Sequence, residues 1–316
     1  MADCNYDLLI EKLKVFCPDL KVSEPMSRHT TFKVGGPCKA FVEVKELAQL
    51  ENVLELCKSF SAEYFILGKG SNILVADEGW ECIVIKPCGD FNLISFNEET
   101  NEISAGCGVS LASLSSFACE KGIAGFEFAS GIPGTVGGGI RMNAGAYGGE
   151  MSQIVDRCTF MMDGEIKTLK NNELDFGYRH SIFSEIKNCI ILQTVFKSDL
   201  LDSSENIRAR MTELNLRRKE KQPLEYASAG STFKRPSGMF AGKLIEDAGL
   251  KGFSKGDACV SEKHAGFVVN KGSADCADII FVMDHVRKII FEKFGVVLEP
   301  EVIILGNTRL KEVSVN

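Results

Sequence analysis

The stretch GIPGTVGGGIRMNAGAYGG, residues 131–149, holds eight glycines in nineteen positions. Glycine inside a helix or strand is unfavourable by about 0.5–1 kcal/mol relative to alanine. So dense a cluster predicts a segment whose backbone N–H groups lie open to an anion, and a diphosphate suits such a concavity. A tight multi-turn connection without a ligand is the alternative. It explains Gly148 and Gly149 well but the glycines of residues 134–139 poorly.

Two common phosphate-binding motifs are excluded. The P-loop requires G-x-x-x-x-G-K-[ST], and no lysine follows any glycine of this segment. The dinucleotide pattern G-x-G-x-x-G fails in GKGSNI, residues 68–73, and in GCGVSL, residues 106–111, because both end on an aliphatic residue. The sequence therefore predicts a diphosphate cradle that is neither a Walker loop nor a Rossmann loop.

A second glycine-lined turn, GKGSN at residues 68–72, follows a predicted strand at residues 64–67. Proteins of mixed helix and strand place ligands at the carboxyl ends of strands. Ser71 and Asn72 add hydroxyl and amide donors to this turn. Two glycine-lined turns on separate segments favour one long cofactor that contacts both.

Composition narrows the class of protein. The 316 residues carry a net charge of -7, which argues against a nucleic-acid partner because phosphate backbones are bound through lysine and arginine. None of the 12 cysteines stands in a C-x-x-C pair, and no cysteine–histidine cluster has zinc spacing, so buried thiols in a reducing cytosol and no metal are expected. No apolar run approaches the roughly 18 residues of a membrane span. We expect a cytoplasmic protein without membrane insertion.

At roughly 100–200 residues per domain, the length of 316 residues predicts two or three domains, and hydrophobic periodicity predicts the elements within them. Helices are expected at residues 6–16, 47–57, 111–121, 240–248 and 273–294, with another that begins near residue 203. Strands are expected at residues 40–44, 64–67, 82–86, 93–96, 102–105, 158–162, 165–169, 189–196, 258–260, 267–270 and 297–305.

Nine blocks of the chain carry a family resemblance. They are TTFKVGG (30–36), GKGSNIL (68–74), SGIPGTVGG (130–138), NAGAYG (143–148), YRHS (178–181), KQPLE (221–225), AGSTFK (229–234), KHAGFVVN (263–270) and LEPEV (298–302). In this order they resemble the UDP-N-acetylenolpyruvoylglucosamine reductase family. Any one block is only suggestive, but the ordered set is specific and spans nearly the whole chain.

The resemblance implies an α+β protein with an FAD-binding fold of the vanillyl-alcohol-oxidase type. It has two subdomains, residues 1–86 and 87–200, and a C-terminal α+β substrate-binding domain, residues 201–316. It further implies a monomeric enzyme of peptidoglycan precursor synthesis. NADPH would reduce non-covalently bound FAD, and hydride would then pass to the vinyl CH2 carbon of a small-molecule substrate, UDP-N-acetylglucosamine enolpyruvate.

The resemblance also implies roles for individual residues. Arg179 and Glu301 match the pair that stabilises the enolate, and Ser231 matches the proton donor. The expected cofactor-binding residues are Gly68, Gly70, Ser71, Asn72, Ile132, Pro133, Gly134, Gly137, Gly138, Asn143, Gly145 and Ala146. The expected substrate-binding residues are Tyr178, Lys221 and Arg235.

Several residues keep alternative interpretations. Arg217, Arg218 and Lys221 could bind the UDP phosphates or complement a helix end. His180 and His264 are expected to be structural hydrogen-bonding residues rather than catalysts.

The chain also departs from the family pattern. Ile303 stands where the family often has a basic residue, and Arg235 stands where one branch has asparagine. An insertion with an extra substrate-covering tyrosine is not evident, which indicates the shorter subgroup.

Three other functions compete with this interpretation. Another FAD-dependent oxidoreductase of the same fold would share residues 131–149 but not the blocks at 229–234 and 298–302. A non-catalytic flavin- or nucleotide-binding module would leave Arg179, Ser231 and Glu301 without a purpose. A UDP-sugar transferase would need no flavin at all.

Overall fold

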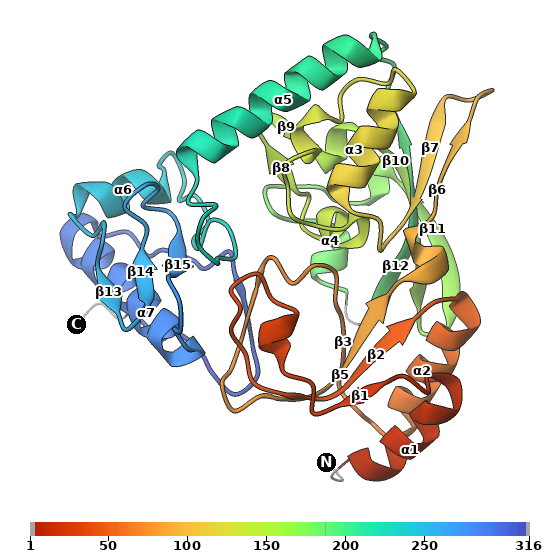
Figure 1. Cartoon of the computed structure of the whole chain (residues 1–316), viewed down its shortest axis with the longest axis horizontal. Coiled ribbons are helices and arrows are strands. Elements are labelled where there is room, and N and C mark those ends of the chain that lie inside the picture. Colours follow the sequence, from red (N-terminus) through yellow and green to blue (C-terminus); the bar gives the residue numbers. More distant parts are fainter. Residues whose placement is uncertain (1–3, 187, 314–316) are drawn as a thin grey trace. The chain divides into compact units, whose positions relative to one another are not determined.

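The computed structural model describes residues 4–186 and 188–313. The chain forms two compact units, each assembled from separated segments (Figure 1). The first unit comprises the chain up to Leu20, Phe41–Gly68 and Ile83–Arg218, and the second comprises Lys21–Ala40, Lys69–Cys82 and the chain from Lys219 onward. The three-part division at residues 86 and 200 stays a prediction.

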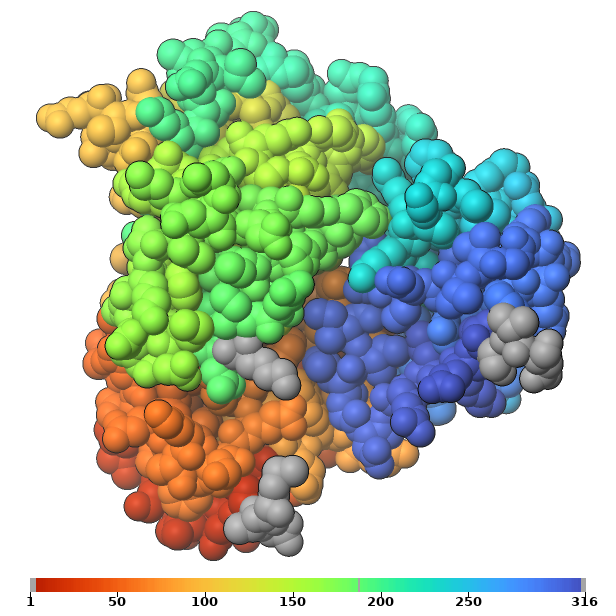
Figure 2. All heavy atoms as spheres, turned by 180° about the vertical axis from the view of Figure 1, so that it is seen from behind, coloured from red at the N-terminus to blue at the C-terminus, as the bar shows by residue number. Residues whose placement is uncertain are grey.

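The first unit is built around a five-stranded sheet of order β11-β10-β12-β7-β6, whose paired strands are all antiparallel. Its strands are β6 (Ile94–Asn97), β7 (Glu102–Gly106), β10 (Val155–Met162), β11 (Glu165–Lys170) and β12 (Cys189–Lys197). Its helices are α1 (Tyr6–Phe16), α2 (Leu47–Ser59), α3 (Leu111–Glu120) and α4 (Val136–Arg141), with the short pair β8 (Gly145–Ala146) and β9 (Gly149–Glu150). The turn between β6 and β7 projects from the surface in Figure 2.

A second sheet has the order β1-β2-β5-β3. Its strands are β1 (Lys21–Val22), β2 (Cys38–Val44), β3 (Tyr64–Ile66) and β5 (Trp80–Pro87), and β2 and β5 contribute residues to both units. β3 and β5 are parallel, with Tyr64 opposite Ile83. In the chain, α2 lies between β2 and β3, and residues 67–79 connect β3 to β5.

The second unit packs its core against one long helix, α7 (Cys276–Phe294). Asp275 caps the start of α7 by accepting from Asp278 N at 2.8 Å, and Gly295 ends it with a left-handed φ of 69°. The other elements are β4 (Ile73–Val75), α6 (Ala241–Asp247), β13 (Ser254–Lys255), β14 (Ala258–Val260), β15 (Val268–Asn270) and β16 (Ile303–Leu305). The predicted α+β class is confirmed by this mixture of helices and strands.

The last predicted strand is shorter than expected. Residues 297–305 were expected to be extended throughout, but regular pairing is confined to β16, which runs parallel to β4. Pro300 forms an isolated antiparallel bridge with Phe233. Proline has no N–H to give to a ladder, so residues 298–302 find their partners outside a regular strand.

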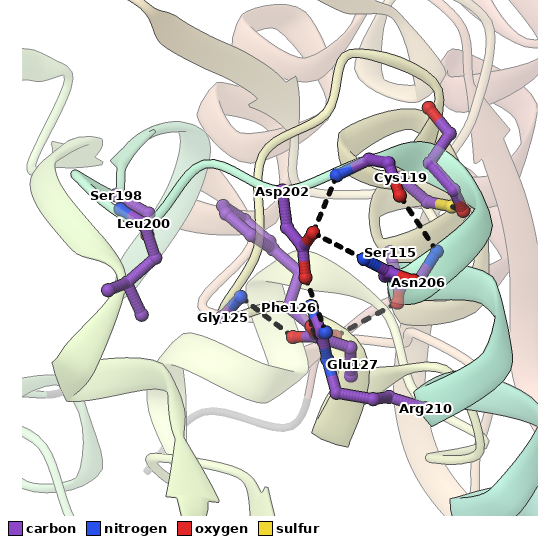
Figure 3. A network of polar contacts seen from close by, with 12 residues as sticks. Ser115, Cys119, Gly125, Phe126, Glu127, Ser198, Leu200, Asp202, Asn206 and Arg210 are labelled. Atoms are coloured by element: carbon purple, nitrogen blue, oxygen red, sulfur yellow. Dashed lines mark hydrogen bonds and ion pairs between the residues drawn. The ribbon is translucent and has the colours of Figure 1, made fainter.

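Helix α5 (Ser204–Lys221) is fastened to the first unit by a polar network, drawn in Figure 3. Arg210 donates from Nε to Glu127 at 2.9 Å and from Nη1 to Asp202 at 2.6 Å. Glu127 is buried and also accepts from Gly125 N at 2.7 Å. Hydrogen bonds from Asn206 and Arg210 lower the pKa of Asp202 to about 2. The network ties α5 to Glu127, which lies four residues before the glycine-rich segment begins at residue 131.

We expect Arg210→Ala to lower the free energy of unfolding by about 1–2 kcal/mol, because it leaves the buried Glu127 carboxylate without its cation. The loss is smaller than for a fully buried pair, since the Arg210 side chain is 43% exposed. Urea unfolding measures the change. The exposed Arg208→Ala on the same helix is the control and should stay within about 0.5 kcal/mol. Equal effects of the two variants would contradict the structural role of the network.

Candidate active site

The glycine-rich segment folds into a short helix and a small hairpin. Thr135 begins α4, and its hydroxyl accepts from Gly138 N at 3.4 Å. β8 and β9 then pair antiparallel, with Gly145 opposite Glu150. Thr135 was missed as a site residue. A threonine directly before VGGGI is a helix N-cap signal that could have identified it.

Most of these glycines are required by packing. An added Cβ would lie 3.2 Å from Leu111 at Gly134, 3.0 Å from Cys107 at Gly137, and 3.3 Å from Leu111 at Gly139. At Gly149 it would lie 2.5 Å from the ring of Phe128. The purely structural explanation therefore accounts for more of residues 134–139 than the sequence suggested.

Gly138 is the exception among them. It is exposed, lies inside α4, has no left-handed φ, and an added Cβ would meet only Thr135 Oγ1 at 3.6 Å. Helical glycine costs about 1 kcal/mol relative to alanine, and the fold gives nothing in return at this position. Packing within the described residues therefore does not account for the bare backbone at Gly138, whereas an outside group that approached it closely would.

The first glycine turn meets this segment at Gly68. A Cβ at Gly68 would lie 2.6 Å from Thr135 Oγ1, so residues 68 and 135 are in direct contact within the first unit. Ile132 and Pro133 form the turn before Thr135, where Gly134 N donates to Ile132 O at 2.9 Å. Thus Gly68 lies beside the predicted cofactor-binding residues of the glycine-rich segment.

The rest of that turn belongs to the second unit. Gly70 has a φ of 61°, and a Cβ there would lie 2.0 Å from His29 O, so only glycine fits. Ser71 is half-buried. Asn72 donates from Nδ2 to the backbone oxygen of Glu301 at 3.0 Å.

Arg218, on α5, is half-buried beside the glycine-rich segment. A Cβ at Gly131 would lie 3.2 Å from Arg218 Cδ and Nη1. Within the described residues, Arg218 Nε is buried and has no hydrogen-bond partner. Burial lowers the pKa of Arg218, yet a guanidinium stays charged in proteins. Arg217, by contrast, forms an exposed pair with Glu213. Of these two arginines, Arg218 is therefore the one whose guanidinium has a donor left for an anion.

Arg179 is presented by a tight turn of the first unit. Gly177 and His180 exchange backbone hydrogen bonds of 3.0 and 3.2 Å, so Tyr178 and Arg179 form the tip, and Arg179 has a φ of 55°. Its Nη2 donates to Gly145 O at 3.2 Å, and its guanidinium lies 5.2 Å from the Tyr178 ring centroid.

The fully buried Asn143 fixes the base of this turn. It donates from Nδ2 to Gly177 O at 3.0 Å and accepts from Ser152 N at 2.9 Å. Gly145 and Ala146 follow in β8, so residues expected to bind the cofactor are joined directly to the turn that carries Arg179.

Ser231 and Glu301 lie on neighbouring segments of the second unit. Glu301 N donates to Thr232 O at 2.9 Å, one residue beyond Ser231. Glu299 is exposed and pairs with Lys234 at 3.5 Å, whereas Glu301 is half-buried.

The predicted substrate-binding residues differ in their surroundings. Arg235 is exposed and lies 5.3 Å from the Phe240 ring centroid. Lys221 is exposed at the end of α5. Both belong to the second unit, and Tyr178, which is also exposed, belongs to the first.

The two histidines expected to be structural make hydrogen bonds. His180 Nε2 lies 3.3 Å from Asp175, and His264 Nδ1 accepts from Gly266 N at 3.1 Å. Burial lowers the pKa of His264. Across residues 4–186 and 188–313, histidine, cysteine and acidic side chains form no group that could hold a metal ion, and no helix could cross a membrane.

Comparisons with known proteins identify relatives of both parts of the chain. Residues 222–305 match the C-terminal domain of UDP-N-acetylenolpyruvoylglucosamine reductase, and residues 38–170 match an FAD binding domain. The UDP-N-acetylenolpyruvoylglucosamine reductase of Agathobacter rectalis is 46% identical over 294 residues, 90% of this chain and 93% of that protein. That of Caldanaerobacter subterraneus is 45% identical over 303 residues, 95% of this chain and 99% of that protein.

A solved structure agrees with these sequence relatives. UDP-N-acetylenolpyruvylglucosamine reductase from Thermus caldophilus has a TM-score of 0.77 and 34% identity, and the alignment covers 90% of this chain and 99% of that one. The prediction of FAD is confirmed by the FAD binding domain. The site fits such a cofactor, because Gly138 leaves backbone open and the buried Nε of Arg218 has no hydrogen-bond partner within the described residues, so a diphosphate oxygen could accept from it.

The variant Gly138→Ala distinguishes an effect on FAD binding from an effect on the stability of the fold. We expect the FAD-free protein to be unchanged or up to about 1 kcal/mol more stable, since alanine favours a helix. The dissociation constant of FAD should rise roughly tenfold or more, because the methyl group occupies cofactor space. Thermal unfolding and flavin fluorescence titration measure the two effects. The neighbouring Gly139→Ala should instead destabilise the fold through its contact with Leu111. Unchanged FAD affinity in Gly138→Ala would contradict the cradle.

Proposed function

Because the chain belongs to the UDP-N-acetylenolpyruvoylglucosamine reductase family, we propose that it reduces the enolpyruvyl double bond of UDP-N-acetylglucosamine enolpyruvate and forms UDP-N-acetylmuramate for peptidoglycan precursor synthesis. FAD, when bound, takes hydride from NADPH and supplies it to the vinyl CH2 carbon. The adjacent α-carbon then carries negative charge, which the substrate carboxylate delocalises as an enolate. The chain must stabilise this charge and supply one proton.

Ser231 is proposed to supply the proton. Its Oγ–H bond breaks as the α-carbon gains a C–H bond, and the resulting alkoxide regains a proton from solvent. A serine is a weak acid, so the step requires a strongly basic acceptor and close positioning, and an enolate meets the first condition. The observation that carries the proposal is the hydrogen bond from Glu301 N to Thr232 O, which holds the segments of Ser231 and Glu301 side by side.

Arg179 is proposed to bind the substrate carboxylate. A guanidinium can hold a carboxylate through two parallel hydrogen bonds, and its charge stabilises the enolate where the charge grows. Support comes from the tight turn at Gly177 and from the hydrogen bond to Gly145 O, which restrain the arginine before substrate arrives. Glu301 is proposed to complete the charge-stabilising pair.

Arg218 is proposed to bind the FAD diphosphate, because its guanidinium lies beside Gly131 and its buried Nε has no hydrogen-bond partner within the described residues. Lys221, Arg235 and Tyr178 are proposed to contact the UDP-sugar. Position 303 is an isoleucine, 44% exposed, and therefore offers a ligand no basic side chain.

The remaining assignments are also proposals. We infer a monomeric enzyme of the cytoplasm with two FAD-binding subdomains, residues 1–86 and 87–200, and a substrate-binding domain, residues 201–316. Residues 222–305, which match a C-terminal domain, fall within the last of these three parts.

The two half-reactions test the chemistry. Ser231→Ala should leave flavin reduction by NADPH within about twofold, and it should slow reoxidation by UDP-N-acetylglucosamine enolpyruvate by at least about a hundredfold. Anaerobic stopped-flow absorbance of the flavin measures both steps. Ser237→Ala, an exposed serine of the following loop, is the control.

Two outcomes would contradict the proposal. Equal loss in both half-reactions would remove Ser231 from proton transfer. Reduced wild-type flavin that stays reduced with this substrate would exclude the reductase and favour another FAD-dependent oxidoreductase.

Arg218→Met tests the phosphate assignment. The FAD-free variant should be at least as stable as the parent, because a half-buried guanidinium whose Nε has no hydrogen-bond partner within the described residues is removed. FAD affinity should fall roughly 10- to 100-fold with the loss of charge-assisted hydrogen bonds. Arg217→Met, which removes only an exposed pair with Glu213, should change neither value appreciably. If only the KM for substrate rises in Arg218→Met, the arginine serves the UDP phosphates instead.

A further inference from the structure

The backbone around Glu301 is held from several directions within the second unit. Arg287 Nε donates to Leu298 O at 3.0 Å, and Lys234 N donates to Glu299 O at 2.9 Å. Glu301 N donates to Thr232 O at 2.9 Å. The irregular segment before β16 is thus fastened residue by residue, and Glu301 itself is fixed on its N–H side by the segment that carries Ser231.

Asn72 holds the other side of Glu301. Its Nδ2 donates to Glu301 O at 3.0 Å, and its backbone oxygen accepts from Ile303 N at 2.9 Å. One residue therefore binds two positions of the 301–303 segment, at the point where β4 and β16 begin their parallel pairing. The side chain replaces the ladder hydrogen bond that an additional strand residue would have made.

The turn that carries Asn72 is itself rigid. Gly70 packs against His29 O, and Gly70 O accepts from Thr31 N at 3.1 Å. After Asn72 the chain enters the fully buried strand β4. Asn72 is therefore anchored on both sides, and its amide can transmit that fixed position to Glu301.

We propose that Asn72 is a positioning residue for Glu301, rather than only a ligand of the cofactor. This inference rests on the proposed function of Glu301 and goes beyond it. An amide of this length is needed for the role. Aspartate lacks the donor and would repel the Glu301 carbonyl, whereas serine is too short to reach it from the same backbone position. The hydrogen bond fixes the α-carbon of Glu301, and thereby where its carboxyl group can lie relative to Ser231.

The test is a double-mutant cycle between Asn72→Asp and Glu301→Ala in the holoenzyme, with Asn72→Ala as a second route if the aspartate variant folds poorly. In the parent background, either Asn72 variant should slow flavin reoxidation by UDP-N-acetylglucosamine enolpyruvate roughly 10- to 100-fold, the range for loss of one hydrogen bond to a buried group. At saturating FAD, flavin reduction by NADPH should fall by much less than the reoxidation rate, whatever the substitution does to the FAD dissociation constant. The loss should appear in the reoxidation rate at saturating substrate rather than in KM.

The cycle separates positioning from general destabilisation. In the Glu301→Ala background, the Asn72 substitution should cause little further loss, because the group it positions is gone. Asn52→Ala is the matched control, since Asn52 also donates its amide to a backbone oxygen, that of Ala48 at 2.8 Å in α2. It should leave both half-reactions unchanged.

Three results would overturn the inference. Multiplying losses in the double variant would show that Asn72 acts independently of Glu301. A large rise in the FAD dissociation constant with equal loss in both half-reactions would make Asn72 a cofactor ligand alone. Unimpaired reoxidation in Glu301→Ala by itself would reject the proposed role of Glu301, a failure that is distinguishable because it needs no change at Asn72.

Discussion

Every buried backbone N–H and C=O group needs a hydrogen-bond partner, and this constraint is hardest to meet in segments that are neither helix nor strand. The residues proposed for catalysis lie in such segments. Asparagine side chains meet the need repeatedly, since an amide offers both a donor and an acceptor in the manner of a peptide group. Asn143 joins Ser152 to the Arg179 turn. Asn270 joins Phe32 O to Gly272 N and Ala274 N in the second unit.

The regular elements were predictable because local signals and hydrophobic periodicity agreed. The helix expected at residues 273–294 begins after the Asp275 cap and ends at Gly295, and the expected helix at residues 111–121 is α3. The strand expected at residues 297–305 was wrong over most of its length. Apolar residues at both ends of this stretch indicated a strand, but Pro300 interrupts the ladder, and no local pattern reports a partner as distant in sequence as Asn72.

The candidate site was only partly predictable from the sequence, because the sequence indicates the unusual segment but not the contacts that each residue makes. Glycine density identified residues 131–149 correctly as unusual, yet packing against Leu111 and Cys107 explains several of those glycines, and only the fold distinguishes Gly138 from them. Arg217 and Arg218 looked equivalent in the sequence. Helical geometry separates them, because Arg218 lies on the face of α5 that contacts Gly131, whereas Arg217 pairs with Glu213 in solvent.

The conformation of Arg179 sets the stability of its turn against the role proposed for its guanidinium. A non-glycine residue with a φ of 55° costs about 1–2 kcal/mol, which glycine would not incur. Selection for a more stable fold alone would favour glycine at the tip of this turn, and it would thereby remove the guanidinium. A redesign of this chain for stability would need to leave this turn unchanged, because only a strained arginine places a guanidinium at its tip.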